Sequence, residues 1–549
     1  MPALTSLTTM PDEPGAEFAG PRHTGDNEEL SCYSQMHSTH AEVLRPADVD
    51  ELEEMFADAR AAGRRMTLRA GGNAFDAQSL GADVVISLEH LDAIGEVFDD
   101  DDDECVTVGS GARWGDILEK VAPLGLVPAI MVTTENATAG GTLSGNCLSR
   151  FSPTFGKEGG WVKRFKLLTV TGERIECTPP ADDQEPETWT LAQRAYMSAI
   201  GGLGYIGAVY EITYKLVRAY DPGVEGVGEI AVKTTLTKHK TYEHLADALV
   251  KEAHRMCHRE IPAGITLAEH SENQAIYSAL VRRTSGKQSA LVFCSTYTTD
   301  PKRKSLPIHQ PKSAFRFISE MLLRTPLDWI LTLFAYHVLF RPRTTYIDEL
   351  RGFTFFMDGN SRVKAWGKRH GMRMPTVQQT FVVPFDPDAR FDSEEEAEMA
   401  GCNKLAAWLD ESHELLRAHK VRPAFSDVLF VRDTKRFGLS SNAGMAGFAV
   451  SYAFETSNEK TLARVAEAFA ALADKLTEER FDGRVYLVKN VYASQATLRA
   501  MYGDNAIGLL KLKRRLDPDC LLANDFFDRA FGDLSTETYA GAFGVDTSI

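Results

Sequence analysis

A run of small residues at positions 136–146, NATAGGTLSGN, has the composition of a phosphate-binding segment. Glycines let backbone N–H groups approach a ligand closely, and successive N–H groups can hold a phosphate without a positive side chain. The same composition is also typical of a surface loop, and so many Gly, Ser and Thr residues argue against packed core. We therefore interpret residues 137–146 as a candidate diphosphate site outside the core.

A second glycine-rich stretch, GLGYIG at residues 202–207, matches the dinucleotide fingerprint GxGxxG. That fingerprint requires a strand before it and a helix after it, because the helix N-terminus holds the pyrophosphate. Here a helix-like segment precedes it, at 193–200, and an alternating β-branched stretch follows, at 208–216. The order of elements is reversed, so we reject a Rossmann site.

Metal-ligating residue types are present but do not form a recognisable site. His254, Cys257 and His258 share one face of a predicted helix, yet Arg255 stands where a zinc protease needs Glu, and no further ligand is evident. The eight cysteines contain no CxxC pair, which indicates neither a disulfide scaffold nor a zinc ribbon. We expect no metal and a reducing, cytoplasmic location.

The composition excludes several classes of protein. The chain has 549 residues, 44% hydrophobic and 25% charged, which is the balance of a globular protein of two to four domains. Its net charge of −17 argues against nucleic acid as a partner. The first 40 residues have no basic and apolar signal pattern, so we expect residues 1–40 to form a disordered or loosely packed tail.

Residues 327–340, LDWILTLFAYHVLF, form the one stretch that suggests a membrane. The stretch is shorter than the roughly 20 apolar residues that a spanning helix needs. It is interpreted either as a buried core helix or, because basic residues flank it, as a segment lying on a bilayer surface. The second interpretation predicts peripheral membrane contact through residues 317–341.

The remaining periodicity predicts an α+β protein. The pattern predicts helices at 46–63, 114–124, 193–200, 241–257, 398–419 and 459–478, and strands at 65–70, 84–88, 94–98, 105–108, 165–170, 174–177 and 208–216. Six consecutive acids at 99–104 are expected to be a solvated hairpin tip. A change in character places a domain boundary near residue 220.

The order of these pieces resembles the FAD-binding domain of the vanillyl-alcohol oxidase family, also called the PCMH-type FAD domain. The supporting motifs are RAGGNAF at 69–75, VTVGSGARWG at 106–115, TAGGT at 138–142, LLTVTGE at 167–173 and GGLGYIG at 201–207. The resemblance implies a two-lobed FAD-binding domain at 41–220, a substrate or cap domain with an antiparallel sheet at 221–505, and a C-terminal segment at 506–549 that returns to the FAD domain.

The second half is most similar to decaprenylphosphoryl-ribose oxidases and polyol oxidases. The motifs are YIDEL at 346–350, FFMD at 355–358, QQTFVVP at 378–384, RVYLVK at 484–489 and LKRRLDP at 512–518. Residues 140–180 also resemble 24-dehydrocholesterol reductase, a family that reduces a carbon–carbon double bond.

The resemblance assigns residues to an FAD site. Where many relatives carry a histidine and a cysteine that bond covalently to the flavin, this chain has Asn73 and Thr134, so we expect non-covalent FAD. The implied cofactor-binding residues are Arg69, Ala70, Gly71, Gly72, Asn73, Ala74, Thr138, Ala139, Gly140, Gly141, Thr142, Ser144, Gly145, Phe155, Gly207, Val209 and Asn524.

The resemblance also implies catalytic roles for Lys489, Tyr486 and Gln378. An ammonium beside the flavin stabilises charge that develops in hydride transfer, and an amide can both donate to and accept from a hydroxyl. Strict strand alternation would separate Tyr486 from Lys489, so a bend is needed there. Leu148, Thr380 and Ser451 are the expected substrate-pocket residues, and with Ala449 they predict a pocket less polar than a sugar site.

These assignments predict an FAD-dependent oxidoreductase that moves a hydride between flavin N5 and a substrate carbon. One version oxidises a CH–OH group of a polyol, sugar or lipid-linked substrate. An alternative reduces a C=C bond of a lipid or sterol, with a proton from Tyr486. A third interpretation is an inactive flavin-fold binding module. The expected partners are a small-molecule or lipid substrate and an electron donor or acceptor.

Overall fold

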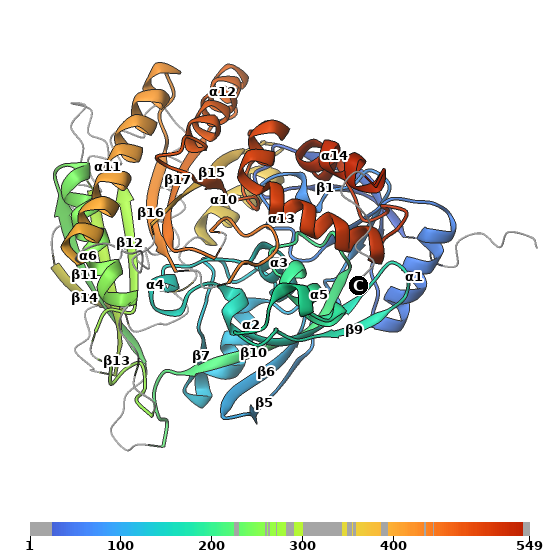
Figure 1. Ribbon diagram of the computed structural model, residues 1–549. Coiled ribbons are helices and arrows are strands. Elements are labelled where there is room, and N and C mark those ends of the chain that lie inside the picture. The colour runs from blue at the N-terminus through green and yellow to red at the C-terminus, as the bar shows by residue number, and fades with distance from the viewer. Residues whose placement is uncertain are drawn as a thin grey trace, which may run out of the picture.

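Three β-sheets organise the part of the chain that the structure describes (Figure 1). The computed structural model describes residues 23, 25–223, 230–257, 261, 264–270, 272–280, 290–299, 343–347, 354, 358–385, 394–432, 435–442 and 444–541. Two smaller sheets form two lobes, and an eight-stranded sheet forms a separate layer beside them. The chain is therefore α+β, as the periodicity predicts.

The first lobe is a four-stranded sheet in the order β1-β2-β4-β3. Its elements are β1 Asp26–Ser31, β2 Ser38–Leu44, α1 Val49–Ala61, β3 Met66–Arg69 and β4 Val84–Ser87. Asp48 caps α1 by accepting from the N–H groups of Asp50 and Glu51, and buried Leu52 and Phe56 point from α1 into the lobe core. The predicted helix at 46–63 and both predicted strands are confirmed.

Strand β1 corrects the expected N-terminal tail. Residues 26–31 pair antiparallel with β2, so the expectation of a loosely packed tail up to residue 40 is wrong for residues 26–40. The sequence does not predict this strand because its residues are polar. They lie at the edge of the sheet and are largely exposed, so they need no alternation of apolar and polar side chains.

The second lobe is built around the long strand β10, Ala208–Arg218, which pairs antiparallel with β6, β7 and β8. Its other elements are β5 Ile94–Asp100, β6 Asp103–Gly109, α2 Trp114–Val121, β7 Leu126–Pro128, α3 Ala139–Gly145, β8 Val162–Leu168, β9 Arg174–Cys177 and α5 Leu191–Ala199. The acidic run is the β5–β6 turn, as expected. Because α5 precedes the GLGYIG stretch and β10 follows it, the rejection of a Rossmann site is confirmed.

The small-residue segment is packed more tightly than the sequence suggested. Residues 139–145 form the short helix α3, whose Ala139, Gly140 and Leu143 are buried. The Gly140 N–H donates to Ser110 O at 2.9 Å, and a Cβ at Gly140 would lie 2.5 Å from the Ser110 Cβ. The expectation that this segment lies outside the core is wrong, because its small side chains are what allow the close approach.

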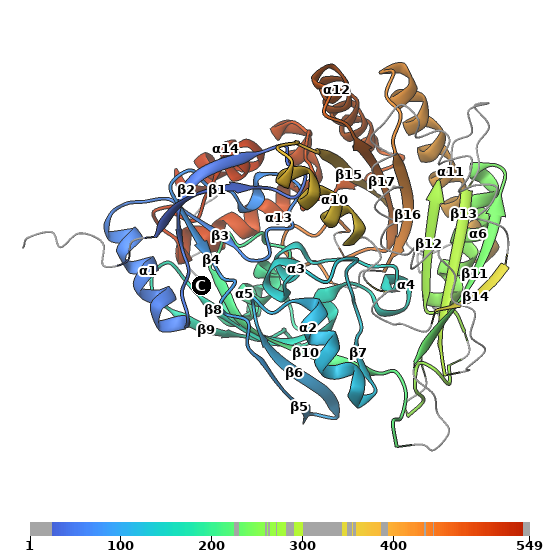
Figure 2. The ribbon, with the colours of Figure 1, turned by 180° about the vertical axis from the view of Figure 1, so that it is seen from behind.

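The eight-stranded sheet has the order β14-β11-β13-β12-β16-β17-β15-β18. Its strands are β11 Ala231–His239, β12 Ala275–Leu280, β13 Ala290–Thr298, β14 Arg343–Ile347, β15 Thr376–Pro384, β16 Phe425–Val431, β17 Gly447–Glu455 and β18 Arg484–Val485. The accompanying helices are α6 Tyr242–Cys257, α10 Asp358–Arg369, α11 Glu394–Ala418 and α12 Glu459–Leu476. Figure 2 shows α11 and α12 rising beside β16 and β17.

Alternation along β15 separates the two faces of this sheet. Phe381 packs against Trp408 of α11 and Phe469 of α12, whereas Gln378 and Thr380 face a cavity on the other side. The sheet therefore has a helix-covered face and a face turned towards the two lobes. The predicted helices at 241–257, 398–419 and 459–478 are confirmed as α6, α11 and α12.

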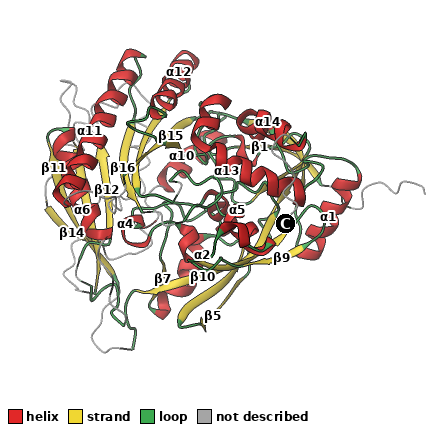
Figure 3. Cartoon of the chain, in the orientation of Figure 1, coloured by secondary structure: helices red, strands yellow, loops and turns green. Residues whose placement is uncertain are grey.

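Two helices, α13 Gln495–Leu516 and α14 Asp525–Tyr539, are the last elements of the described part of the chain (Figure 3). The Lys513 ammonium is fully buried and donates to Tyr205 O, Leu522 O and the Asp517 carboxylate. Leu522 also bridges to Met66 of β3. These contacts attach the C-terminal segment to both lobes.

Residues 317–341, for which membrane contact is expected, lie outside the described residues. Among the residues that are described, no helix combines the length and the apolar character needed to cross a membrane.

Candidate active site

A cavity of about 440 Å³ opens between the two lobes and the eight-stranded sheet. Its lobe side is formed by the loop after β3, by α3 with the residues around it, and by residues at the start of β10. Its sheet side is formed by residues of β12, β15, β16 and β17, with the segment that follows β18. A ligand in this cavity would touch all three parts of the molecule.

Most of the residues expected to bind a cofactor lie on its lobe side. Those that line the cavity are Ala70, Gly71, Gly72, Asn73, Ala74, Thr138, Gly140, Gly141, Thr142, Ser144, Gly145, Gly207 and Val209. The Gly71 N–H donates to Thr138 Oγ1 at 3.0 Å, which joins the two glycine-bearing segments. Asn73 Nδ2 donates to Asn136 O at 2.9 Å, and Thr134 lines the same space.

Glycine at position 141 keeps this wall open. A Cβ added there would meet only Thr138 Oγ1 at 3.1 Å and Ala70 Cβ at 3.9 Å, both of them part of the wall. Neither Gly140 nor Gly141 has a positive φ, so the need at both positions is for space and not for a left-handed backbone. A larger side chain at position 141 would therefore occupy the cavity while leaving the fold of the lobe intact.

Four residues expected at the cofactor lie outside the cavity lining. Arg69 donates to Ser79 Oγ and Ser31 O, and Ala139, the first residue of α3, is fully buried. Phe155 packs edge-on against Trp161, and Asn524 caps α14 while its amide donates to Gln78 O. Their side chains hold the surrounding elements together, and their contact with a cofactor stays a prediction.

The residues expected to be catalytic meet at the sheet side of the cavity. Strand β18 ends at Val485, and the Lys489 N–H donates to Tyr486 O at 3.3 Å, so a turn replaces the strand. This is the bend that alternation required, and both Tyr486 and Lys489 line the cavity. Lys489 Nζ donates to Gln378 Oε1 at 3.2 Å.

The electrostatics of Lys489 are those of a buried ammonium. Its Nζ lies 4.0 Å from the centroid of the Phe75 ring, and burial lowers its pKa to about 8. The negative charge of Asp427 opposes that shift. Lys489 is thus held as a positive charge with little water around it, and it is not a surface lysine.

Asp427 of β16 is a cavity residue that the sequence analysis missed. Its side chain is only 8% exposed, and Oδ1 has no hydrogen-bond partner. Burial raises its pKa to about 7, against the opposing effects of a hydrogen bond with Ser451 and the charge of Lys489. The available signal was a lone acid at the third position of the apolar strand FSDVLFV.

The expected pocket residues Leu148, Thr380 and Ser451 all line the cavity, and Thr380 Oγ1 lies 2.8 Å from Ser451 Oγ. The sheet side also carries Asp427, Gln378 and Glu455. This wall is more polar than the sequence analysis expected, because strand pairing brings together acids and amides that are far apart in the sequence.

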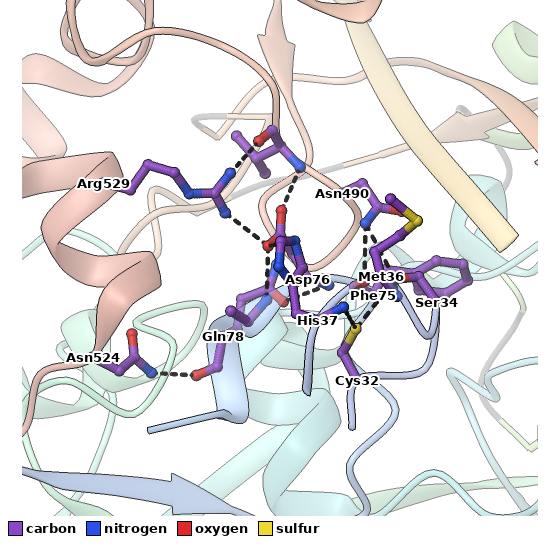
Figure 4. Close-up of polar contacts among 12 residues, drawn as sticks. Cys32, Ser34, Met36, His37, Phe75, Asp76, Gln78, Asn490, Asn524 and Arg529 are labelled. Carbon is purple, nitrogen blue, oxygen red and sulfur yellow. Dashed lines mark hydrogen bonds and ion pairs between the residues drawn. The ribbon is translucent and has the colours of Figure 1, made fainter. Parts of the chain in front are cut away.

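The segment that carries Lys489 is fastened by a polar network (Figure 4). Asn490 donates from its N–H to Gln378 O and accepts from the Gln378 N–H at Oδ1, both at 2.9 Å. Its Nδ2 donates to Phe75 O at 2.9 Å. Asn490 therefore ties Lys489, Gln378 and the loop after β3 to one another.

Asp76 fastens the same segment from the first lobe. Its carboxylate accepts from the Val491 N–H at 3.0 Å and from Arg529 at 2.7 Å, and His37 Nε2 lies 3.1 Å away. Burial alone would raise the pKa of Asp76, but His37 and Arg529 hold it at about 2. Gln78 donates to the carbonyls of Leu487 and Lys489 beside it.

The N-terminal turn contributes a further wall. Tyr33 lines the cavity, its N–H donates to Ala74 O at 2.8 Å, and its ring lies 4.8 Å from that of Phe75. Tyr33, expected to belong to a tail, is instead part of the cavity wall.

No group of three or more His, Cys, Asp or Glu residues in the described ranges could hold a metal ion. His254 Nδ1 lies 3.8 Å from Glu398 Oε1 on the helix face of the sheet domain, and His258 lies outside those ranges.

Residues 41–178 match the family model described as FAD binding domain. This part of the chain is similar to an FAD-binding domain. The match spans the two glycine-bearing segments of the cavity, so the lobe side is where FAD is expected. The residues present fit that cofactor, since backbone and small side chains leave the space open.

Curated relatives match over a limited part of the chain. Cytokinin dehydrogenase 8 of Oryza sativa, subspecies indica and japonica, is 31% identical over 113 residues, which is 20% of this chain and 19% of the relative. Cytokinin dehydrogenase 3 of Oryza sativa subsp. japonica is 26% identical over 179 residues, 32% of each chain. The chain thus spans about a fifth to a third of the length of these relatives.

Proposed function

We propose that this chain is an FAD-dependent oxidoreductase that binds FAD without a covalent link and oxidises a CH–OH group of a small-molecule or lipid-linked substrate. The observation that carries the proposal is one cavity, shared by the FAD-binding segments and by Lys489 with Gln378. The dehydrogenase names of the curated relatives agree with this direction.

The chain's own residues divide the work. Backbone around Gly71 and Gly141 holds the cofactor, which accepts a hydride when bound. Lys489 supplies a fixed positive charge beside the reacting oxygen, where charge develops. Gln378 Oε1 accepts from Lys489, so its Nε2 is the group that donates to a substrate oxygen.

Alkene reduction has weaker support. It needs a proton donor, and Tyr486 was expected to be that donor. The Tyr486 hydroxyl donates to Gly145 O at 3.2 Å, and burial raises its pKa well above 10. A hydroxyl that is engaged elsewhere and holds its proton tightly is a poor acid, which favours oxidation of an alcohol.

The test is anaerobic. Candidate alcohols, from polyols to long-chain and sterol alcohols, are added to the oxidised, FAD-saturated protein, and flavin absorbance is followed. Loss of the oxidised flavin spectrum with an alcohol supports the proposal. Bleaching by no alcohol, together with reoxidation of the chemically reduced protein by an alkene, would reverse the direction of the reaction.

A further inference from the structure

Asp427 places a largely buried carboxyl at the wall of the cavity. Its side chain is more than nine-tenths buried, it lines the cavity, and its Oδ1 has no donor within reach. A buried carboxyl oxygen without a partner is costly, because it has lost water and gained nothing in exchange. The Asp427 carboxyl is therefore short of hydrogen-bond donors where the residue lines the cavity, and a ligand can bring a donor to it.

The charged and titratable groups around it define which donor is suitable. Lys489 faces it from the segment after β18, Tyr277 from β12, and Ser451 donates from β17. Glu455 and Cys147 line other parts of the cavity. The Lys489 ammonium disfavours a second cation in this space, so a neutral donor is preferred over a protonated amine.

We propose that Asp427 binds the substrate hydroxyl and accepts its proton, and that the substrate is therefore a neutral alcohol. The inference rests on the proposed oxidoreductase function and assigns to it the group that takes the proton. Asp427 and Lys489 then have separate roles, one accepting a proton and the other stabilising the charge on oxygen.

The step balances with oxidised FAD as the oxidant. The carbinol C–H bond breaks and its hydrogen leaves with two electrons as a hydride to the flavin. The O–H bond breaks and its proton passes to the Asp427 carboxylate. The electron pair of the O–H bond forms the second bond of the carbonyl, so the alcohol becomes an aldehyde or ketone and Asp427 becomes a neutral acid.

Two variants separate binding from proton transfer. Asp427→Asn keeps an oxygen that accepts a hydrogen bond but cannot take the proton, whereas Asp427→Leu can do neither. The FAD-saturated proteins are titrated with tert-butanol, which donates a hydrogen bond but has no carbinol hydrogen to lose, and with trimethylacetonitrile, which has no donor. Flavin absorbance reports binding, and Asp182→Asn at an exposed surface position is the matched control.

We expect tert-butanol to bind wild type and Asp427→Asn with affinities within about threefold, and to bind Asp427→Leu about tenfold more weakly. Trimethylacetonitrile should bind all of them alike. Flavin reduction by an alcohol that bleaches wild type should slow by about 10²-fold or more in Asp427→Asn, with Asp182→Asn unchanged.

The proposal is overturned if tert-butanol has no advantage over the nitrile in wild type, or if Asp427→Asn reduces its flavin at the wild-type rate. If Asp427→Leu does not fold, the reduction rate of Asp427→Asn still decides. If no alcohol bleaches wild type, alcohol oxidation fails as the function, while the binding comparison still tests Asp427 as a hydroxyl site.

Discussion

At the scale of single residues, the site combines a buried ammonium and a buried carboxyl across one cavity. Burying either charge alone would carry a desolvation penalty, and the opposite charge of its neighbour reduces that penalty. Residues with strongly shifted pKa values are concentrated at functional sites. An ion pair that only stabilises the fold has no need to line a cavity, so the position of this pair indicates a functional role.

Replacing Lys489 by Ala should slow the chemical step while leaving the protein folded and yellow. A group that stabilises developing charge typically contributes about 10²-fold or more to the rate. Lys489→Arg should recover little, since a planar guanidinium cannot place its charge where the ammonium lies. Single-turnover flavin absorbance measures this, with exposed Lys460→Ala as control. A rate within about twofold of wild type would remove Lys489 from the mechanism.

The rate of flavin reduction should have a narrow pH optimum. Asp427 has its pKa raised to about 7 and accepts a proton only above that pH, whereas Lys489 has its pKa lowered to about 8 and keeps its charge only below it. Activity should therefore peak between about pH 7 and 8, with limbs that belong to the coupled pair. Asp427→Asn should lose the acidic limb, and a profile that keeps it would assign that limb to another group.

At the scale of elements, the site depends on small residues that let α3 and the loop after β3 leave a space. Gly141→Val should give a colourless but folded protein, because its side chain fills the FAD side of the cavity. Gly160→Val is the matched control, since nothing lies within 4 Å of a Cβ at that position. Flavin absorbance per protein after purification measures occupancy, and equal colour in both variants would place FAD elsewhere.

The segment that carries Lys489 is fastened by Asp76, which links it to α14. The pKa of Asp76 falls from 3.8 to about 2 on folding, so its carboxylate stabilises the protein above pH 4 and that stabilisation is lost as pH falls towards 2. The shift corresponds to roughly 2 kcal/mol. Asp76→Asn should lower the melting temperature at pH 7 and reduce the difference between the melting temperatures at pH 7 and 3. An unchanged melting temperature would show that this network is not structural.

At the scale of the whole molecule, we expect FAD to contact both lobes and the sheet without a covalent bond to any of them. Asn73 and Thr134 cannot form the covalent links of other flavoproteins, so acid precipitation should release all the colour into the supernatant. Returning FAD to the stripped protein at about 100 times its dissociation constant should add about 2.7 kcal/mol of stability, seen as a higher melting temperature. Colour that stays in the pellet would contradict non-covalent binding.

The lobes and helices could be predicted because their signals are local. These signals depend only on residues within one turn or strand. Examples are the cap Asp48, the helical period of α1 and α12, and the glycines of the loops. Asp427 and Tyr33 could not be predicted in this way. Each enters the cavity through pairing with distant strands, and no local period reports which face of β16 or which turn will meet the FAD-binding domain.

The contacts of Asn490 also determine how late in synthesis the cavity can be completed. Its amide holds Phe75, 415 residues earlier, and Ser34, 456 residues earlier. At about 5–20 residues per second, a ribosome needs roughly 20–80 s to make the intervening chain. During that time the loop after β3 cannot contact Asn490, so the cavity stays incomplete until the chain around residue 490 has been made.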